Sequence, residues 1–521
     1  MFTIDPFVPS RSESPMQRRI PVLLGIDAGT TSVKTVVFDL AGEILAVSRS
    51  SVHLLRGDDG AVEADMDALW TATASTIRDA LESPSGEDFD PDVVAIGITG
   101  QGDGAWLIDE AGRPVRPAAL WLDGRAAPRV AAWEGDGRAE AVRAATASPL
   151  NSGALPVLWS ELAERDPEAI ARAHTHLNCK DWLRFKLTGV RATDPSDASR
   201  GFLNIGDGTY DEALLAAAAD PRLRDILAPV LDPAAVGGRV TEESGREVGL
   251  PAGIPVAVGM VDTGAAGVGM GAIGDGEGYM ILGTTGFVGV NQKNREALTT
   301  NLGIVLRTGR GEQVLETLVP MSGTPNLDWV RQTLDLEGLG WQEIEEEARR
   351  AGPGSGGVLY LPYGSPSGER APFVDPNASA SWLGMSVTTT SGQLLRSVYE
   401  GLAFALVECL DLLGLEEEVS ICGGGSDSDL LCQILADVSG RRIRRQDAPE
   451  VGARGAASLA LLASGRVETL AEAVSALASD SSVFAPNPER HDSSVRAYRT
   501  FITVRDALRP HWPAVRALRA H

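Results

Sequence analysis

The chain has 521 residues, of which 43% are hydrophobic and 22% charged, and it contains 58 glycines. This composition excludes a disordered, collagen-like or coiled-coil chain and predicts a globular protein of about three to four domains, or of two large ones. The formal net charge of −25 disfavours nucleic acid and anionic membranes as partners. A bound anion would therefore need local backbone donors or a metal ion.

The cysteines and the chain start bear on the compartment. The four cysteines form no Cys-x-x-Cys pair, which gives little support to a disulfide framework or a zinc site and favours reduced thiols. There is no apolar run of about 18 residues, and the first twenty residues have no apolar signal core. We expect a cytoplasmic protein in which residues 1–20 form a flexible extension.

The first half of the chain alternates between strand and helix patterns. After Pro21 comes a buried apolar strand, then a Gly/Thr turn, then a β-branched strand that ends at Gly42, and residues 44–50 predict a third strand. Helical patterns follow, over residues 64–81, 138–147 and 159–174. This alternation is typical of an α/β domain.

Near Pro251 the cycle starts again. IPVAVGMVDTGAAGVGMG leads into EGYMILGTTGFVGV, which repeats the order of apolar strand, Gly-Thr-Thr and β-branched strand. We predict two domains of similar plan, over residues 21–255 and 256–510, with a hinge within residues 251–259. The second domain carries longer helical patterns, over residues 393–413 and 426–438.

Three turns have the composition of phosphate-binding loops. In the first, Gly29, Thr30 and Thr31 offer backbone N–H groups and hydroxyls, Asp27 could hold a hydrated Mg²⁺, and Lys34 could reach a terminal phosphate. A plain tight turn and a solvated lysine are the alternatives. The other two turns contain Gly283, Thr284, Thr285 and Gly286, and Gly423, Gly424 and Gly425 before a helix. Such turns on two similar domains indicate an ATPase of the actin, Hsp70 and sugar-kinase type.

An ordered set of motifs makes the resemblance specific. The segments are GIDAGTTSVK, GITGQGDG, LWLDGR, CKDWLRFKLTG with TDPSDAS, VGMVDTGAA, LGTTG, GERAPFVDPNA, SASWLGMSVTTTSGQLLRSVYEG, CGGGSDSDLLCQILADV and GARGAASLA. Over residues 23–470 the chain resembles the FGGY family of carbohydrate kinases. The resemblance implies two ribonuclease-H-like domains that flank a catalytic cleft, with sugar mainly on the first and ATP mainly on the second. The resemblance also implies a homodimer.

The resemblance also implies roles for individual residues. Asp262 matches the catalytic base, and Asp27 matches the metal and phosphate position, with Mg²⁺ held by both carboxylates through water. The nucleotide positions are Thr30, Thr31, Lys34, Thr284, Gly424 and Ser428. A base fits the chemistry, because an alcohol must lose its proton as its bond to phosphorus forms. For Asp262 alone, a helix N-cap is the alternative.

The acceptor is predicted from a short segment around Gln101. Xylulokinase-like members usually have Met-His where this chain has Gly102-Asp103, and a carboxylate accepts from hydroxyls but suits a ketone oxygen poorly. Gln101, Asp103 and Asp262 could bind adjacent oxygens of an acyclic polyol, and Trp106 or Trp121 could cover its carbons. Asp123 and Arg125 lie in the family's sugar-proximal region, with a loop-fixing ion pair as the alternative.

Within the family, GQGDGAWLID and LWLDGR are most similar to the erythritol kinases, in the xylulokinase-like branch. NSGALPVLWSEL departs from the family pattern, since it lacks the lysine of S-x-x-K-L-x-W. The sequence predicts an Mg-ATP-dependent kinase that forms erythritol phosphate, with neither nucleic acid nor membrane as partner. A pentitol or xylulose is the alternative substrate. The alternatives of another class are a nucleotide-switch ATPase and a binding module that has lost turnover.

Overall fold

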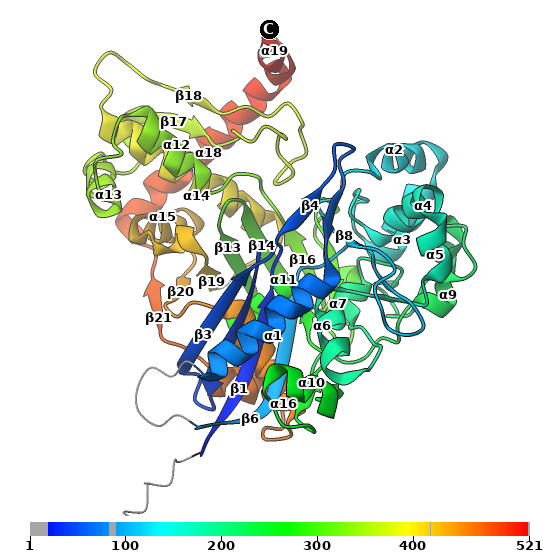
Figure 1. The fold of residues 1–521 in the computed structure, drawn as a ribbon. Coiled ribbons are helices and arrows are strands. Elements are labelled where there is room, and N and C mark those ends of the chain that lie inside the picture. Colours follow the sequence, from blue (N-terminus) through cyan, green and yellow to red (C-terminus); the bar gives the residue numbers. More distant parts are fainter. Residues whose placement is uncertain (1–18, 83–89, 417, 519–521) are drawn as a thin grey trace, which may run out of the picture.

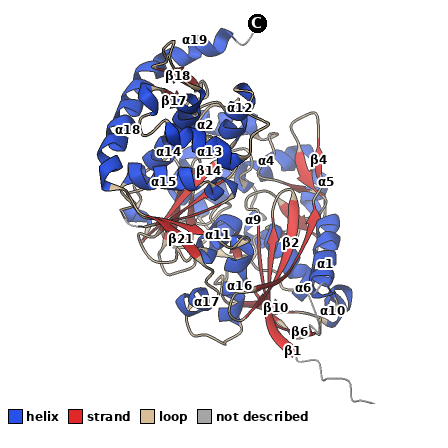
Figure 2. Cartoon of the chain, turned by 90° about the vertical axis from the view of Figure 1, so that its left-hand side faces the viewer, coloured by secondary structure: helices blue, strands red, loops and turns tan. Residues whose placement is uncertain are grey.

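A computed structural model describes residues 19–82, 90–416 and 418–518 (Figure 1). The predicted extension therefore lies outside the described residues except for its last two. The described part forms two seven-stranded sheets and three smaller sheets of two or three strands. Figure 2 shows the two large sheets as separate groups of strands with helices around them. Within this part of the chain, no helix is long and apolar enough to cross a membrane.

The first sheet is built from strands of the first half of the chain. Its order is β10-β11-β6-β1-β2-β3, with β12 also paired to β6. Hairpin partners β1, β2 and β3 are antiparallel, whereas β6 runs parallel to β1, β11 and β12. The strands are β1 (Arg19–Ala28), β2 (Ser32–Asp39), β3 (Ile44–Ser51), β6 (Asp90–Gly100), β10 (Val236–Arg239), β11 (Pro255–Ala257) and β12 (Met260–Val261).

The second sheet repeats this plan. Its order is β15-β16-β14-β13-β19-β20-β21, in which β13, β14 and β16 are antiparallel neighbours and β19 runs parallel to β13 and β20. The match confirms the prediction of two ribonuclease-H-like domains. The strands are β13 (Gly278–Leu282), β14 (Gly286–Gln292), β15 (Val305–Arg307), β16 (Val314–Leu318), β19 (Val419–Cys422), β20 (Ile443–Gln446) and β21 (Ser481–Phe484).

The helices and short strands of the first half follow the predicted pattern with one break. The predicted helix over residues 159–174 is two helices, because Asp166 caps a new helix that begins at Pro167. The elements are β4 (Leu54–Arg56), β5 (Val62–Ala64), α1 (Met66–Glu82), β7 (Trp106–Ile108), β8 (Ala118–Ala119), α2 (Ala127–Asp136), α3 (Arg138–Thr146), α4 (Leu155–Arg165), α5 (Pro167–Arg172), β9 (Thr175–Leu177), α6 (Cys179–Thr188), α7 (Pro195–Ala198), α8 (Glu212–Ala217), α9 (Leu223–Ile226) and α10 (Glu242–Val248).

In the second half, the two helices predicted from periodicity are present. The second of them begins at Asp429 and is capped by Ser428, whose side chain accepts from the Leu431 N–H. The elements are α11 (Asp262–Gly269), α12 (Pro325–Thr333), α13 (Trp341–Arg350), β17 (Leu359–Leu361), β18 (Ser381–Leu383), α14 (Ser391–Leu412), the 3₁₀ turn Gly424–Asp427, α15 (Asp429–Ser439), α16 (Val451–Ala463), α17 (Leu470–Ala476), α18 (Pro488–Leu508) and α19 (Trp512–Ala517).

Helix α16 joins the two halves of the molecule. It comes from the second half of the sequence but packs on β1 and β6 of the first sheet and on α11. A Cβ at Gly97 of β6 would lie 1.9 Å from the Ala456 carbonyl oxygen, and one at Gly455 would lie 1.9 Å from that of Ala265. Only glycine allows these approaches, so the backbones of α16, β6 and α11 are in direct contact.

The boundary between the halves differs from the predicted one at residue 255. Strands β11 and β12 complete the first sheet, so this sheet continues through Val261. The predicted hinge over residues 251–259 therefore includes part of the first sheet. An apolar strand after Pro251 reads the same in either domain, and only its pairing with β6 assigns it.

Candidate active site

The site lies at the carboxyl ends of three parallel neighbouring strands. In the sheet register Ala28 of β1 pairs with Gly100 of β6, and Gly100 pairs with Val261 of β12. The next residues, Gly29, Gln101 and Asp262, therefore leave the sheet at the same edge. Ligands of open α/β sheets bind at this edge, where the loops diverge. The register brings together segments that are far apart in the sequence.

Asp262 is the first residue of α11 and is partly buried. Its Oδ1 accepts from the Thr263 N–H at 2.6 Å. Burial raises the pKa of Asp262 to about 7, with a further increase from the negative charges of Asp27 and Asp103. A carboxylate with a pKa near neutrality is well matched to proton transfer at physiological pH.

Asp27, near the end of β1, also has a perturbed environment. Burial raises its pKa, the Lys34 ammonium opposes this increase, and Glu450 adds to it. Asp27 lines a cavity of about 400 Å³ together with Lys34, Gly423, Gly424 and Glu450. This cavity joins the first predicted phosphate loop region to the Gly-Gly-Gly turn of the second sheet.

The chemistry of the two carboxylates fits a divalent cation. The described residues include no group of three or more His, Cys, Asp and Glu side chains that could hold a metal by themselves. Mg²⁺ commonly uses one or two carboxylates together with substrate phosphates and water. Because Asp27 raises the pKa of Asp262, a cation near both would relieve their repulsion.

The Lys34 side chain is engaged with a residue from the far end of the sequence. Its Nζ donates to Glu450 Oε2 at 2.9 Å, and the Arg49 Nη2 donates to Glu450 Oε1 at 2.8 Å. Glu450 has a φ of 68° and stands immediately before α16. Lys34 thus faces the predicted nucleotide cavity while it is held by a carboxylate that sequence reasoning missed.

The second Gly-Thr-Thr loop lines a different cavity. Thr284 and Thr285 border a cavity of about 620 Å³ whose other walls include Trp329, Tyr360 and Trp382. The Gly283 carbonyl of this loop accepts from the Thr324 N–H at 2.9 Å. A Cβ at Gly425 would lie 2.9 Å from the Thr324 Cγ2. The second Gly-Thr-Thr loop and the Gly-Gly-Gly turn therefore line separate cavities in this structure.

Thr30 links the first loop to the predicted acceptor segment. Its Oγ1 donates to Gln101 Oε1 at 3.0 Å and accepts from Trp121 Nε1 at 3.1 Å. Trp121 is 43% exposed. An indole that covers a substrate has to be accessible in this way. Trp106 has no exposed surface and packs in the core of the first domain. Of the two indoles predicted to cover the substrate, Trp121 is accessible in this structure and Trp106 is not.

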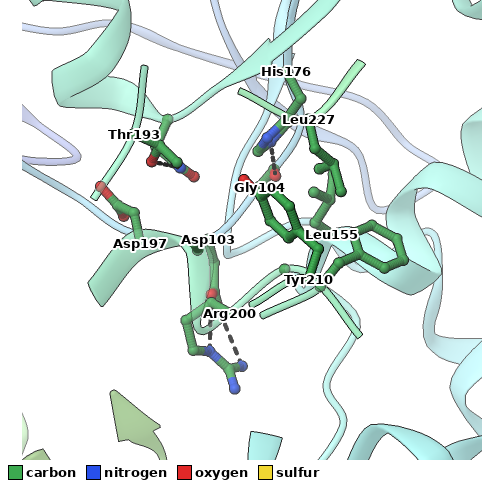
Figure 3. A pocket seen from close by; sticks show the side chains of 13 residues that line it. Asp103, Gly104, Leu155, His176, Thr193, Asp197, Arg200, Tyr210 and Leu227 are labelled. Carbon is green, nitrogen blue, oxygen red and sulfur yellow. Dashed lines mark hydrogen bonds and ion pairs between the residues drawn. The ribbon is translucent and has the colours of Figure 1, made fainter. Parts of the chain in front are cut away.

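Asp103 is paired with an arginine that the sequence did not single out. Arg200 donates from Nε to Asp103 Oδ1 at 2.9 Å and from Nη2 to Asp103 Oδ2 at 3.2 Å (Figure 3). Arg200 directly follows the TDPSDAS motif, so the motif located the segment although the pairing could not be foreseen. The Asp103 carboxylate is therefore paired with a cation through both of its oxygens.

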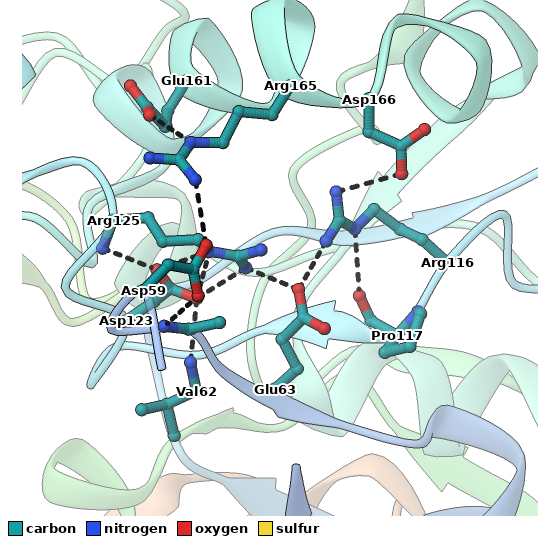
Figure 4. A network of polar contacts seen from close by, with 11 residues as sticks. Asp59, Val62, Glu63, Arg116, Pro117, Asp123, Arg125, Glu161, Arg165 and Asp166 are labelled. Carbon is teal, nitrogen blue, oxygen red and sulfur yellow. Dashed lines mark hydrogen bonds and ion pairs between the residues drawn. The ribbon is translucent and has the colours of Figure 1, made fainter. Parts of the chain in front are cut away.

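Asp123 and Arg125 form the loop-fixing ion pair that was one of the two alternatives. Arg125 Nη2 donates to Asp123 Oδ2 at 2.6 Å and also pairs with Glu63, which contacts Arg116 in turn (Figure 4). Asp123 has no exposed surface and accepts from the Val62 N–H. These residues fix the loop that carries Trp121, so a direct substrate contact by Asp123 or Arg125 is not retained.

The segment before Asp262 is held by a serine of the TDPSDAS motif. Ser196 Oγ accepts from the Val261 N–H at 2.9 Å and donates to Asp194 Oδ2 at 2.5 Å. On the other side, Thr99 Oγ1 donates to the Met260 carbonyl at 2.7 Å. Sequence reasoning quoted the motif without assigning Ser196. The hydrogen bonds make it a positioning residue for Asp262.

Comparison with family models identifies the family of this chain. Residues 22–269 match the N-terminal domain of the FGGY family of carbohydrate kinases, and residues 278–464 match its C-terminal domain. The chain belongs to the FGGY family of carbohydrate kinases. FGGY kinases are phosphotransferases that act on alcohol groups, and this chain is therefore an enzyme of that class.

Individual relatives extend the comparison over nearly the whole chain. An FGGY relative named erythritol kinase, from Brucella abortus, is 32% identical over 96% of this chain and 98% of that protein. Xylulose kinase from Escherichia coli is 29% identical over 94% of this chain and 99% of that protein. Both proteins have names that describe kinases of small carbohydrates.

Solved structures agree with the fold. Xylulose kinase from Rhodospirillum rubrum has a TM-score of 0.84 at 25% identity, over 94% of this chain and 99% of that one. Gluconate kinase from Lactobacillus acidophilus has a TM-score of 0.87 at 23% identity, over 95% and 100%. Both likenesses extend over nearly the whole of this chain.

Proposed function

We propose that this FGGY kinase transfers the γ-phosphoryl group of Mg-ATP to a primary hydroxyl of a small acyclic polyol, with erythritol as the substrate. The observation that carries the proposal is Asp262, a carboxylate of raised pKa at the carboxyl edge of the first sheet, next to Asp27 and Gln101. Its surroundings suit a general base, and the hydroxyl-binding groups lie on the neighbouring strand ends.

In the proposed reaction, Asp262 accepts the hydroxyl proton while the substrate oxygen bonds to the γ-phosphorus. The bond between that phosphorus and the β–γ bridging oxygen breaks, and ADP leaves with the bridging oxygen. Bound Mg²⁺, held by Asp27 and Asp262 through water, would neutralise charge on the phosphates. The assigned nucleotide contacts are Thr30, Thr31, Lys34, Gly283, Thr284, Thr285, Gly424 and Ser428.

Two observations favour a polyol. Asp103 and Gln101 offer oxygens that accept from hydroxyls, and a polyol has a donor on each carbon. The similarity to the Brucella abortus erythritol kinase extends over almost all of both chains. Xylulose is the second candidate, because the xylulose kinases of Escherichia coli and Staphylococcus epidermidis are 29% and 28% identical over 94% and 92% of the chain.

A coupled assay of ADP release tests the proposal. The acceptors are erythritol, other tetritols, pentitols, glycerol and xylulose, each compared with a reaction lacking acceptor. We expect erythritol to give the highest kcat/KM, and Asp262→Asn to abolish turnover while nucleotide binding persists. ATP hydrolysis at the same rate without acceptor would instead support a nucleotide switch. A higher kcat/KM for xylulose would transfer the proposal to the second candidate.

A further inference from the structure

The Asp103–Arg200 pair has the geometry with which a guanidinium binds the carboxylate of a ligand. A guanidinium that contacts both oxygens of a carboxylate is a common receptor for carboxylate and phosphate groups. Here the carboxylate belongs to the protein, since Asp103 occupies the two donors Nε and Nη2 of Arg200. The side chains are only 11% and 6% exposed. Two of the Arg200 donors are thereby occupied by a carboxylate of the protein itself.

The backbone of Asp103 is also unusual, and its conformation restricts the residue types that can stand at this position. Its φ is 59°, a left-handed conformation that glycine adopts readily and that Asp and Asn tolerate better than other residues. Gly102 packs so closely on the residue before Asp262 that a Cβ would lie 2.7 Å from Val261 Cγ2. Asp103 therefore faces the site from a fixed turn beside the proposed base.

Other charged groups near the pair do not replace Asp103. The small cavity beside the pair, of about 10 Å³, is also lined by Asp197, His176 and Tyr210 (Figure 3). Asp197 contacts the Lys180 ammonium at 3.1 Å, and burial raises its pKa well above the usual range. Asp197 is thus engaged with Lys180, and it makes no hydrogen bond to Arg200 among the described contacts.

We propose that Asp103 masks Arg200 and thereby makes the acceptor site selective for neutral polyols against sugar acids. With Asp103 in place, the carboxylate of an aldonate meets an occupied guanidinium and a like charge. Without the Asp103 carboxylate, Arg200 becomes a free receptor for the acid end of a substrate. The inference rests on the proposed polyol kinase and adds the residue pair that sets its charge preference.

The test compares erythritol with erythronate, the four-carbon aldonate that retains a primary hydroxyl. The variants are Asp103→Gly, which suits the positive φ and vacates the carboxylate position, and Asp103→Asn, which preserves the shape and removes the charge. We expect the ratio of kcat/KM for erythronate over erythritol to rise by at least about tenfold in Asp103→Gly. The double variant Asp103→Gly/Arg200→Gln should lose this gain.

A second readout does not depend on turnover of the aldonate. Formate should restore part of the erythritol activity lost in Asp103→Gly, because it can occupy the vacated position against Arg200, and it should not do so in the double variant. A folded Asp103→Gly enzyme with neither gain nor rescue would overturn the inference. A gain that persists in the double variant would also overturn it. If Asp103→Gly does not fold, Asp103→Asn decides by the same erythronate ratio.

The outcome is separable from that of the proposed function. Wild-type activity on erythritol, measured in the same assay, tests the proposed function alone. Active wild-type enzyme without the change in charge preference would reject only the role of the Asp103–Arg200 pair. Inactive wild-type enzyme on all polyols, with activity on sugar acids, would reject both the proposed function and the masking.

Discussion

The Oγ1 of Thr30 donates to Gln101 Oε1 at 3.0 Å and accepts from Trp121 Nε1 at 3.1 Å. One hydroxyl thus joins the predicted phosphate loop to two predicted acceptor residues. The three residues come from the β1–β2 turn, the end of β6 and the loop after β8. In the proposed function, nucleotide and acceptor meet at this side chain, and a change at Thr30 should affect the binding of both.

Thr30→Val removes the hydroxyl at nearly constant volume. We expect KM to rise for both ATP and erythritol, by about tenfold each, since Gln101 and Trp121 lose a fixed partner. Thr30→Ser keeps the hydroxyl and is the matched control, with values close to wild type. Steady-state kinetics with each substrate varied in turn give the comparison. An increase confined to ATP would show that the link to the acceptor segment has no functional role.

The pH dependence of the rate should report Asp262. Its pKa is raised to about 7, and a general base must be unprotonated, so kcat/KM should rise with pH through about 7. Asp27→Asn removes a negative charge that contributes to this pKa, so the rise should move to lower pH while the maximal rate falls. Burial, the larger cause, remains. A pH profile that is identical in the two enzymes would contradict this electrostatic coupling.

Asp262 should also reduce the stability of the folded protein at alkaline pH. Its pKa is higher in the folded state than the ordinary value of 3.8, so the native state binds the proton more tightly than the unfolded chain. The stability from the protonated form is complete below about pH 4 and is lost as pH rises through about 7. Asp262→Asn should therefore raise Tm more at about pH 8 than at about pH 5. Equal increases at both pH values would argue against the raised pKa.

Lys34 is a candidate phosphate contact, and in the structure its ammonium group pairs with Glu450. Lys34→Met should raise KM for ATP by about tenfold, with little effect on KM for erythritol, because a charge-assisted contact to phosphate is lost. Arg49 pairs with the other oxygen of Glu450 and serves as control. Arg49→Met should change KM for ATP much less, since its side chain is 57% exposed and it does not line the nucleotide cavity. Similar effects of both substitutions would assign them to the shared ion pair.

Ser196 should act through the position of Asp262. Ser196→Ala leaves the Val261 N–H without its acceptor, and we expect kcat to fall by about tenfold with a smaller change in KM. Loss of the hydroxyl also leaves Asp194 one donor short. A purely structural role would lower Tm without changing the pH at which kcat/KM rises. The pH profile therefore separates the two roles, and Ser196→Thr should restore part of kcat.

Much of the fold could be predicted because it depends on local order. The repeat of apolar strand, Gly-Thr-Thr and β-branched strand indicated two similar domains, and hairpin strands pair with their neighbours in sequence. The boundary at residue 255 and the single helix over residues 159–174 were wrong for physical reasons. Strands β11 and β12 belong to the first sheet because they pair with β6, which is distant in sequence. A new helix begins at Pro167, and its N-cap Asp166 is identified by the hydrogen bond that its side chain accepts from the Ala169 N–H.

An ordered set of motifs in the sequence identifies the family and locates the turns that hold Asp27, Gln101 and Asp262, and with them the residue types proposed for the chemistry. Which candidate side chains are accessible and which are buried or paired follows only from the packing of distant segments. Trp106 is buried whereas Trp121 is exposed, and Asp123 and Arg125 fix a loop. Asp103 pairs with Arg200, and Lys34 with Glu450, across 97 and 416 residues of chain. Ion pairs over such separations depend on how the sheets and α16 pack, which local sequence pattern does not encode.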